Sequence, residues 1–281
     1  MPRIRLVTDS ACDIPDALLK QYGITVLPLG VATASSHAVS YSDRAQPPSA
    51  PEALSMVEAP EVESFSRLYR VLREGCDGII SIHVSSKLSD TVANALAARE
   101  TFGPGGQGGS FSVAVIDSKS FSMGLGWLVL AVARAASAGL DFAKLNTLAT
   151  HMVEQSHVAF FTESLEGLLQ TGRVPRLQAQ SDSLSSMRPL LHLDDGNVVI
   201  YEKTRTRAKA RDALYNFVED FPHIGQIAII HNGAFSDVEH LLTRVGAIYP
   251  RDQIMLIEPD PPVATWLGPD ALGVAVLEGD E

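Results

Sequence analysis

The sequence predicts an α/β protein of two domains, on three observations. Short apolar runs alternate with helical patterns through the first half, which is typical of βαβ units and a mostly parallel sheet. After about residue 155 the pattern changes, and two short strands flank an Asp-Asp-Gly-Asn turn, which indicates an antiparallel hairpin. The length of 281 residues also exceeds that of one ordinary domain. We expect an N-terminal α/β domain over residues 1–155 and a C-terminal α/β domain with a mixed or antiparallel sheet over residues 156–281.

In the N-terminal half, apolar runs predict four strands, at Arg3–Thr8, Ile24–Val31, Gly78–Val84 and Phe111–Asp117. Apolar side chains at helical spacing predict five helices, at Asp16–Tyr22, Val62–Arg73, Leu88–Thr101, Met123–Ala138 and Asp141–Ser156. The segment Ala32–Pro60 is rich in Ser, Ala and Pro and has weak periodicity, so we expect a long loop there. The glycines of Gly103–Gly109 predict a flexible turn.

In the C-terminal half, the strands are expected at His157–Thr162, Pro189–Leu193, Val198–Glu202, Gln226–His231, and near Ile254–Ile257 and Leu272–Leu277. The helices are expected at Leu165–Gln170, Arg207–Asp220 and Asp237–Val245.

Composition excludes several classes of protein. Lys and Arg number 22 and Asp and Glu 33, so 22 − 33 gives a net charge of −11, which argues against nucleic acid as the default partner. Hydrophobic residues make up 46% of the chain, which excludes wholesale disorder. The two cysteines are too few for a disulfide framework or a cysteine zinc site. No apolar stretch reaches the ~20 residues of a membrane span, and the N-terminal residues lack a signal pattern, so we expect a cytoplasmic protein.

Polar side chains follow three of the predicted parallel strands, as Thr8-Asp9-Ser10, Ser85-Ser86 and Asp117-Ser118. The carboxyl ends of parallel strands share one edge of a sheet, where ligands usually bind. Hydroxyls and helix N–H groups at that edge could receive a carboxylate or a phosphate. Ser and Asp are also ordinary helix caps, but three such groups at one edge favour a binding site.

Other chemical motifs are missing from the sequence. The glycine segments match neither a P-loop nor a dinucleotide fingerprint, and no HExxH or GxSxG motif occurs. His83 lies inside an apolar strand, where a hydrogen-bonded core histidine is more common than a ligand. We therefore expect no metal and no cofactor. The basic segment Lys203–Arg211 is either a solvated helix start or a docking patch for an acidic partner, and the sequence leaves both open.

Seven segments, in order, resemble the DegV family of bacterial fatty-acid-binding proteins. They are Val7–Pro15, Ser81–Ala95, Val115–Gly126, Leu165–Val174, Met187–Gly196, Lys203–Ala210 and Leu267–Val276. The resemblance implies two α/β domains that enclose one fatty acid in an apolar tunnel between them. It also implies a carrier that presents the fatty-acid carboxylate to a separate fatty acid kinase, and no resident cofactor besides the bound lipid.

The resemblance also assigns residues to a head-group site. Ser85 and Ser86 match the serines that contact the carboxylate in the family, and Arg173 matches the arginine of the family's Gly-Arg motif. Arg205 and Arg207 fall in the basic stretch that would face the kinase.

Three segments depart from the family pattern. Val57 stands where the family has a head-group threonine, Trp266 where it has a histidine, and Asp90 where it has a glycine. Two polar partners of a carboxylate are thereby lost, while Glu58, Asp90 and Asp270 add negative charge that repels a fatty-acid anion. The hypothesis is a lipid-binding fold that binds fatty acid weakly or binds another lipid.

Two alternatives remain from the sequence. One is a hydrolase or transferase that uses Asp9, Ser10 or the serine pair, with His83 as the nearest base in sequence. The other is a degenerate paralogue that binds no lipid, because Trp266 fills the head-group space.

Overall fold

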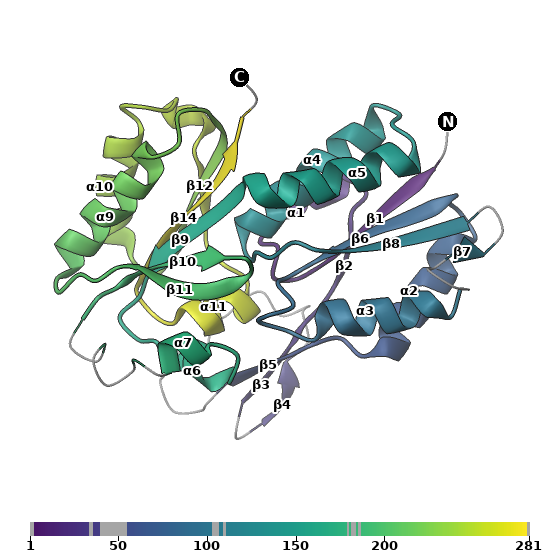
Figure 1. Ribbon diagram of the computed structural model, residues 1–281, viewed down its shortest axis with the longest axis horizontal. Coiled ribbons are helices and arrows are strands. Elements are labelled where there is room, and N and C mark those ends of the chain that lie inside the picture. The colour runs from purple at the N-terminus through teal and green to yellow at the C-terminus, as the bar shows by residue number, and fades with distance from the viewer. Residues whose placement is uncertain are drawn as a thin grey trace.

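Two sheets with flanking helices form two lobes that lie side by side (Figure 1). The computed structural model describes residues 3–33, 36–39, 55–102, 107–108, 111–178, 180, 184 and 187–279. One sheet uses strands from the first 117 residues and the other uses strands from residue 156 onward. The α/β class of the prediction is confirmed, whereas the domain boundary at residue 155 stays a prediction.

The sheet of the first lobe has the order β2-β1-β6-β8-β7. Its strands are β1 (Ile4–Asp9), β2 (Thr25–Leu27), β6 (Gly78–His83), β7 (Gln107–Gly108) and β8 (Phe111–Asp117). The first four in this order are parallel, and only the two-residue β7 is antiparallel to its neighbour. All six residues of β6 are buried, which explains why this central strand is almost continuously apolar.

Helices cover both faces of this sheet. They are α1 (Asp16–Tyr22), α2 (Val62–Arg73), α3 (Thr91–Glu100), α4 (Met123–Ser137) and α5 (Phe142–Met152), which a 3₁₀ turn at Val153–Gln155 extends. α2 and α3 lie on one face, and α4 and α5 lie on the other (Figure 1). α4 is apolar along most of its length because it packs against strands of both sheets, so one hydrophobic core joins the two lobes.

The sheet of the second lobe is mixed, as predicted, with the order β11-β10-β9-β14-β12-β13. Its strands are β9 (Ser156–Phe161), β10 (Leu190–Asp194), β11 (Asn197–Glu202), β12 (Ile224–Asn232), β13 (Met255–Ile257) and β14 (Ala271–Glu278). The expected β10–β11 hairpin is present, and both residues of its tight turn, Asp195 and Gly196, have positive φ.

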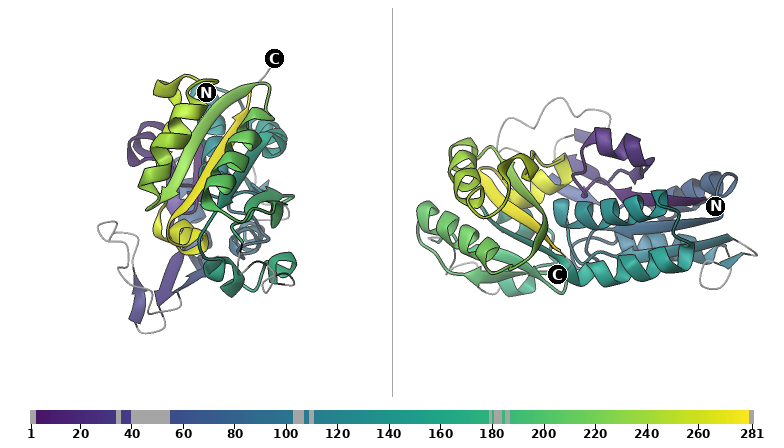
Figure 2. Two further views of the ribbon diagram at one scale, coloured as in Figure 1. Left: turned by 90° about the vertical axis from the view of Figure 1, so that its left-hand side faces the viewer. Right: turned by 90° about the horizontal axis from the view of Figure 1, so that it is seen from above.

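The helices of the second lobe are α6 (Glu166–Gln170), α7 (Pro175–Gln178), α9 (Arg207–Glu219), α10 (Phe235–Val245) and α11 (Pro261–Leu267), with a 3₁₀ turn at Arg251–Gln253. Figure 2 shows α9 and α10 on the outer face of this sheet. α11 packs against α6 on the side that faces the first lobe.

Two predictions about the chain between β1 and α2 are wrong. The expected strand Ile24–Val31 is split at Pro28, which cannot donate a ladder hydrogen bond, and its second part belongs to another sheet. The expected loop Ala32–Pro60 instead contributes to a three-stranded antiparallel sheet of order β4-β3-β5, made of β3 (Gly30–Thr33), β4 (Ser36–Val39) and β5 (Ser55–Glu58). Residues 40–54 lie outside the described part of the chain.

Smaller differences concern short elements. Within the expected turn Gly103–Gly109, residues 107–108 form β7, and the other residues lie outside the described ranges. The sequence reading missed α7 and α11. The Pro-Pro pair that opens α11 is a helix-start signal that could have predicted it.

Candidate functional site

The structure gathers the three polar clusters at one edge of the parallel sheet. The carboxylate of Asp9 accepts a hydrogen bond from Val84 N at 2.9 Å, which ties the end of β1 to the end of β6. Asp117, at the end of β8, accepts a hydrogen bond from Ser86 N at 3.2 Å. The prediction that these strand ends meet is confirmed. Most of their polar atoms, however, hold the loops of this edge in place.

Ser85 is fully buried beneath the β10–β11 turn. Its Oγ donates to the carbonyl of Gly196 at 2.8 Å and accepts from Lys87 N at 3.1 Å. A second contact holds the β10–β11 turn in place, because Lys119 forms an ion pair with Asp195, the residue before Gly196. The Ser85 hydroxyl is therefore covered and hydrogen-bonded within the protein, whereas Ser86 beside it is only half-buried.

Arg173 meets a carboxylate of the protein itself. Its guanidinium pairs with Asp90, the N-cap residue of α3, and both side chains are partly exposed. Asp90 is one of the three acids that the family resemblance predicts to be added near the head group. The other two lie elsewhere, since Glu58 packs beside Gly30 on β3 and Asp270 lies near Gly233 after β12. The structure thus brings one added acid, and not all three, to Arg173.

Trp266 is 1% exposed and lies in the core that joins the lobes. Its ring meets Phe121 edge-on with centroids 6.3 Å apart, and Phe121 meets Phe160 in the same way at 5.6 Å. Val57 on β5 is half-buried and packs against the same core, because β5 contacts α11. These two positions supply apolar surface and no charge.

A largely apolar cavity of about 610 Å³ lies beside α6. Its apolar walls come from Leu165, Leu169, Leu184, Met187 and Pro189. The volume is within the usual range of small-molecule sites. Sequence reasoning missed this cavity, because its walls come from α6 and from the segment before β10, which the chain brings together only on folding.

Glu163 stands at the rim of this cavity between two arginines. Its carboxylate accepts a hydrogen bond from Arg207 Nη1 at 2.8 Å and another from Arg188. Partial burial alone would raise the pKa of Glu163, but the hydrogen bonds and charges of the two arginines outweigh it, so the pKa lies below its usual value.

The basic segment divides into inward and outward side chains. Arg207 donates to Asp237 at 2.6 Å as well as to Glu163, and Arg211 donates to Asp237 at 2.8 Å. The charge of Arg207 is therefore balanced within the protein. Arg205 lies on the exposed part of the segment, together with Lys203 and Lys209.

His83 takes part in a buried chain of hydrogen bonds. Tyr69 donates to Ser81 Oγ at 2.8 Å, Ser81 Oγ lies 2.6 Å from His83 Nε2, and His83 Nδ1 lies 3.0 Å from Asp9 Oδ2. All four side chains have no exposed surface, and burial raises the pKa of Tyr69. His83 thus contacts Ser81 and not the Ser85-Ser86 pair. The Ser81–His83–Asp9 order is like that of a catalytic triad, but these side chains are buried away from solvent.

Neither a metal-ligating cluster nor a membrane-spanning helix occurs among the described residues. Nowhere among them do three or more His, Cys, Asp or Glu side chains converge as a metal site would require. Nor does this part of the chain contain a helix long and apolar enough to cross a membrane.

Comparisons with known proteins agree with this two-sheet α/β architecture. The sequence profile described as an uncharacterised protein of the DegV family matches residues 3–279. A DegV domain-containing protein of Mycobacterium bovis is 30% identical, with 98% of this chain and 97% of that protein covered. The chain belongs to the DegV family, and the resemblance drawn from its motifs is confirmed.

Solved structures show the same fold over the whole chain. A DegV family protein of Thermus thermophilus, described as fatty-acid-binding, has a TM-score of 0.85 at 27% identity and covers 99% of this chain and 100% of its own. A fatty-acid-binding DegV family protein of Streptococcus agalactiae has a TM-score of 0.88 at 22% identity, with 100% of both chains covered. The predicted two-domain α/β fold class is thereby confirmed.

Proposed function

We propose that this chain binds a fatty acid or a related lipid and acts as a carrier, not as a catalyst. The observation that carries the proposal is the match to the fatty-acid-binding protein of Thermus thermophilus, at 27% identity and a TM-score of 0.85 over nearly the whole chain. The sealed Tyr69–Ser81–His83–Asp9 chain supports a non-catalytic role, because a nucleophile without exposed surface cannot meet a substrate. We also propose a cytoplasmic location.

We propose that the acyl chain enters the apolar cavity beside α6. Leu165 and Leu169 line this cavity and also pack against the core that contains Trp266, so an acyl chain there would continue the existing apolar surface. Each methylene removed from water contributes ~0.8 kcal/mol, so an acyl chain that packs along these apolar walls gains affinity from every methylene it buries.

The head group would lie near Ser86 and Arg173. Asp90 already pairs with the guanidinium of Arg173, and the Ser85 hydroxyl donates to the carbonyl of Gly196, which covers it. The side chain of Val57 has no polar atom for a carboxylate, and that of Trp266 has only the indole N–H. These features support weak binding of free fatty acid, or preference for a lipid with an uncharged head group.

For a partner we propose a fatty acid kinase that docks on the exposed cations Lys203, Arg205 and Lys209. Arg207 would support this surface through Glu163 and Asp237, and would not itself contact the partner.

Native mass spectrometry of the gently purified protein, followed by identification of the released lipid, tests the carrier function. We expect one bound lipid per chain. Leu169→Asp should abolish binding because it puts a charge on the cavity wall, whereas Leu256→Asp on the exposed strand β13 should not. A protein that stays empty and takes up no added lipid would contradict the proposal and favour the degenerate paralogue. Ester turnover that depends on Ser85 or Ser86 would favour the hydrolase.

A further inference from the structure

Asp13 links the two lobes through a buried carboxylate. It lies between β1 and α1 in the first lobe and is only 5% exposed. Its Oδ2 accepts a hydrogen bond from Ser122 Oγ at the start of α4, and its Oδ1 accepts one from Asp260 N at 2.8 Å. Asp260 is the N-cap residue of α11 in the second lobe. The start of α11 is therefore held by a side chain that lies 247 residues earlier in the sequence.

The backbone around this carboxylate is strained. Asp13 and Ser122 both have positive φ, at +49° and +52°. Residues with a side chain rarely adopt this conformation, because it brings Cβ close to the following carbonyl oxygen, and it persists only where the surrounding structure holds it. Here Ser122 N donates to Ala11 O at 2.6 Å, so the loops after β1 and β8 hold each other. The Asp13 carboxylate therefore has one fixed position toward α11.

α11 packs against the wall of the cavity beside α6 with almost no space between the two backbones. A Cβ added at Gly167 of α6 would lie 1.9 Å from Thr265 O and 3.2 Å from Trp266 O. A Cβ added at Gly268, directly after α11, would lie 3.2 Å from Ser164 O. Figure 1 shows α11 beside α6. A displacement of α11 would therefore move α6 and the segment before it, which line the cavity.

We propose that Asp13 is a positioning residue of the lipid site. It fixes the start of α11, and α11 in turn fixes α6, whose Leu169 and N-cap residue Leu165 form apolar walls of the cavity. The other end of α11 is held within its own lobe, since Asn232 Nδ2 donates to Gly268 O at 2.7 Å. Through Asp13, the first lobe thus sets the shape of a cavity in the second. The inference rests on the proposed lipid binding and adds a residue that controls its strength.

Amide hydrogen exchange of the lipid-free protein and displacement of a fluorescent fatty acid test the proposal together. Asp13→Ala removes the acceptor of Asp260 N, so it should speed exchange in α11 at least about tenfold and lower lipid affinity about threefold to thirtyfold. Asp13→Asn should stay within about twofold of wild type in both measurements, since its amide keeps that acceptor, can donate to Ser122 Oγ and tolerates a positive φ.

Ile79→Val controls for a general loss of stability. Ile79 is buried on the face of the first sheet that α2 and α3 cover, away from α11. The substitution should destabilise the fold but leave exchange in α11 and lipid affinity unchanged. Unchanged exchange in α11 of Asp13→Ala would overturn the proposal, and so would effects that Ile79→Val reproduces. A wild-type protein that binds no lipid would contradict the carrier function itself, and the inference with it.

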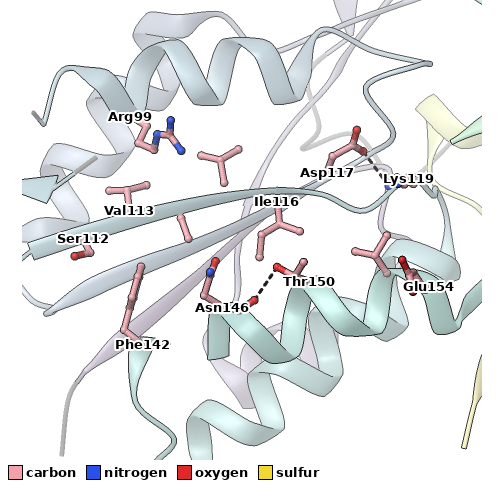
Figure 3. A pocket seen from close by; sticks show the side chains of 13 residues that line it. Arg99, Ser112, Val113, Ile116, Asp117, Lys119, Phe142, Asn146, Thr150 and Glu154 are labelled. Atoms are coloured by element: carbon pink, nitrogen blue, oxygen red, sulfur yellow. Dashed lines mark hydrogen bonds between the residues drawn. The ribbon is translucent and has the colours of Figure 1, made fainter. Parts of the chain in front are cut away.

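Another groove provides a control for the place of the lipid. It has a volume of about 570 Å³ and runs along β8, and Figure 3 shows Asn146 and Thr150 of α5 beside this strand. The described residues that line it all precede β9, so they belong to neither α6 nor α11. Thr150→Trp narrows this groove and should leave lipid affinity unchanged. A loss of affinity in Thr150→Trp would place the lipid along β8 and overturn the proposal.

A second pair of variants keeps the test valid if Asp13→Ala does not fold. Gly167→Ala forces α6 and α11 apart, so it should lower lipid affinity about threefold to thirtyfold. Gly75→Ala should not, because nothing lies within 4 Å of its added Cβ. A lipid affinity that Gly167→Ala leaves unchanged would overturn the proposal, since the contact between α11 and α6 would then not shape the cavity.

Discussion

Asp90 and Arg173 form an ion pair across 83 residues of sequence, between the N-cap of α3 and the loop after α6. The sequence prediction makes Asp90 a departure from the DegV family pattern and Arg173 a position that keeps to it. If that prediction holds, Asp90 places a carboxylate of the protein on the cation that the family resemblance assigns to a carboxylate of the ligand. Both side chains are partly exposed, so a ligand could compete for the arginine at a modest cost.

Asp90→Asn should raise the affinity for free fatty acid, by up to about tenfold, because it frees the Arg173 guanidinium and removes a repelling charge. Displacement of a fluorescent fatty acid measures the affinity. Glu74→Gln, an equal change of charge at the exposed end of α2, is the control and should have no effect. Equal affinities of Asp90→Asn and wild type would show that Arg173 does not hold the head group.

Local patterns in the sequence predicted most of the strands and helices, because periodicity and glycine or proline signals act within a few residues. The pairing of Arg173 with Asp90, and of Glu163 with Arg207, joins side chains 83 and 44 residues apart, so no local pattern could reveal either pair. The same reason explains why the three-stranded sheet β4-β3-β5 was not predicted. β3 and β5 have weak strand patterns in the sequence and form by pairing with each other.

Gly196→Ala should destabilise the protein by about 2–4 kcal/mol. The residue has a φ of +79°, and an added Cβ would lie 2.6 Å from Ser85 Oγ. Gly172→Ala separates the backbone strain of a positive φ from the clash of the added Cβ. Gly172 also has positive φ, at +65°, but nothing lies within 4 Å of its added Cβ. It should cost only about 1 kcal/mol. Urea unfolding measures both, and equal losses would contradict the close packing of the β10–β11 turn on Ser85.

Glu163→Gln should lower stability at neutral pH by about 1–3 kcal/mol, because it removes the charge that Arg188 and Arg207 share. The folded-state pKa of Glu163 is lowered, so its contribution is fully present above the unfolded-state pKa of ~4.3 and is lost as the pH falls through the folded-state pKa. The difference between wild type and Glu163→Gln should therefore shrink as the pH falls below about 4.

Urea unfolding at several pH values measures this difference. The exposed Glu166→Gln, three residues away, should show little loss at any pH. A difference between wild type and Glu163→Gln that stays constant into acid would mean that the two arginines do not stabilise the carboxylate.

Trp266 should report the arrival of lipid through its fluorescence. The chain has two tryptophans, and both are buried in the core against which Leu165 and Leu169 pack. Trp266 lies on α11, which packs directly against α6, whereas Trp127 lies on α4 with its indole N–H 3.4 Å from the carbonyl of Ala275. A lipid in the cavity beside α6 changes the packing around Trp266 first. Titration with lipid should therefore shift the emission of wild type and of Trp127→Phe, and leave that of Trp266→Phe nearly constant. A signal carried by Trp127 instead would place the lipid against α4, away from the cavity beside α6.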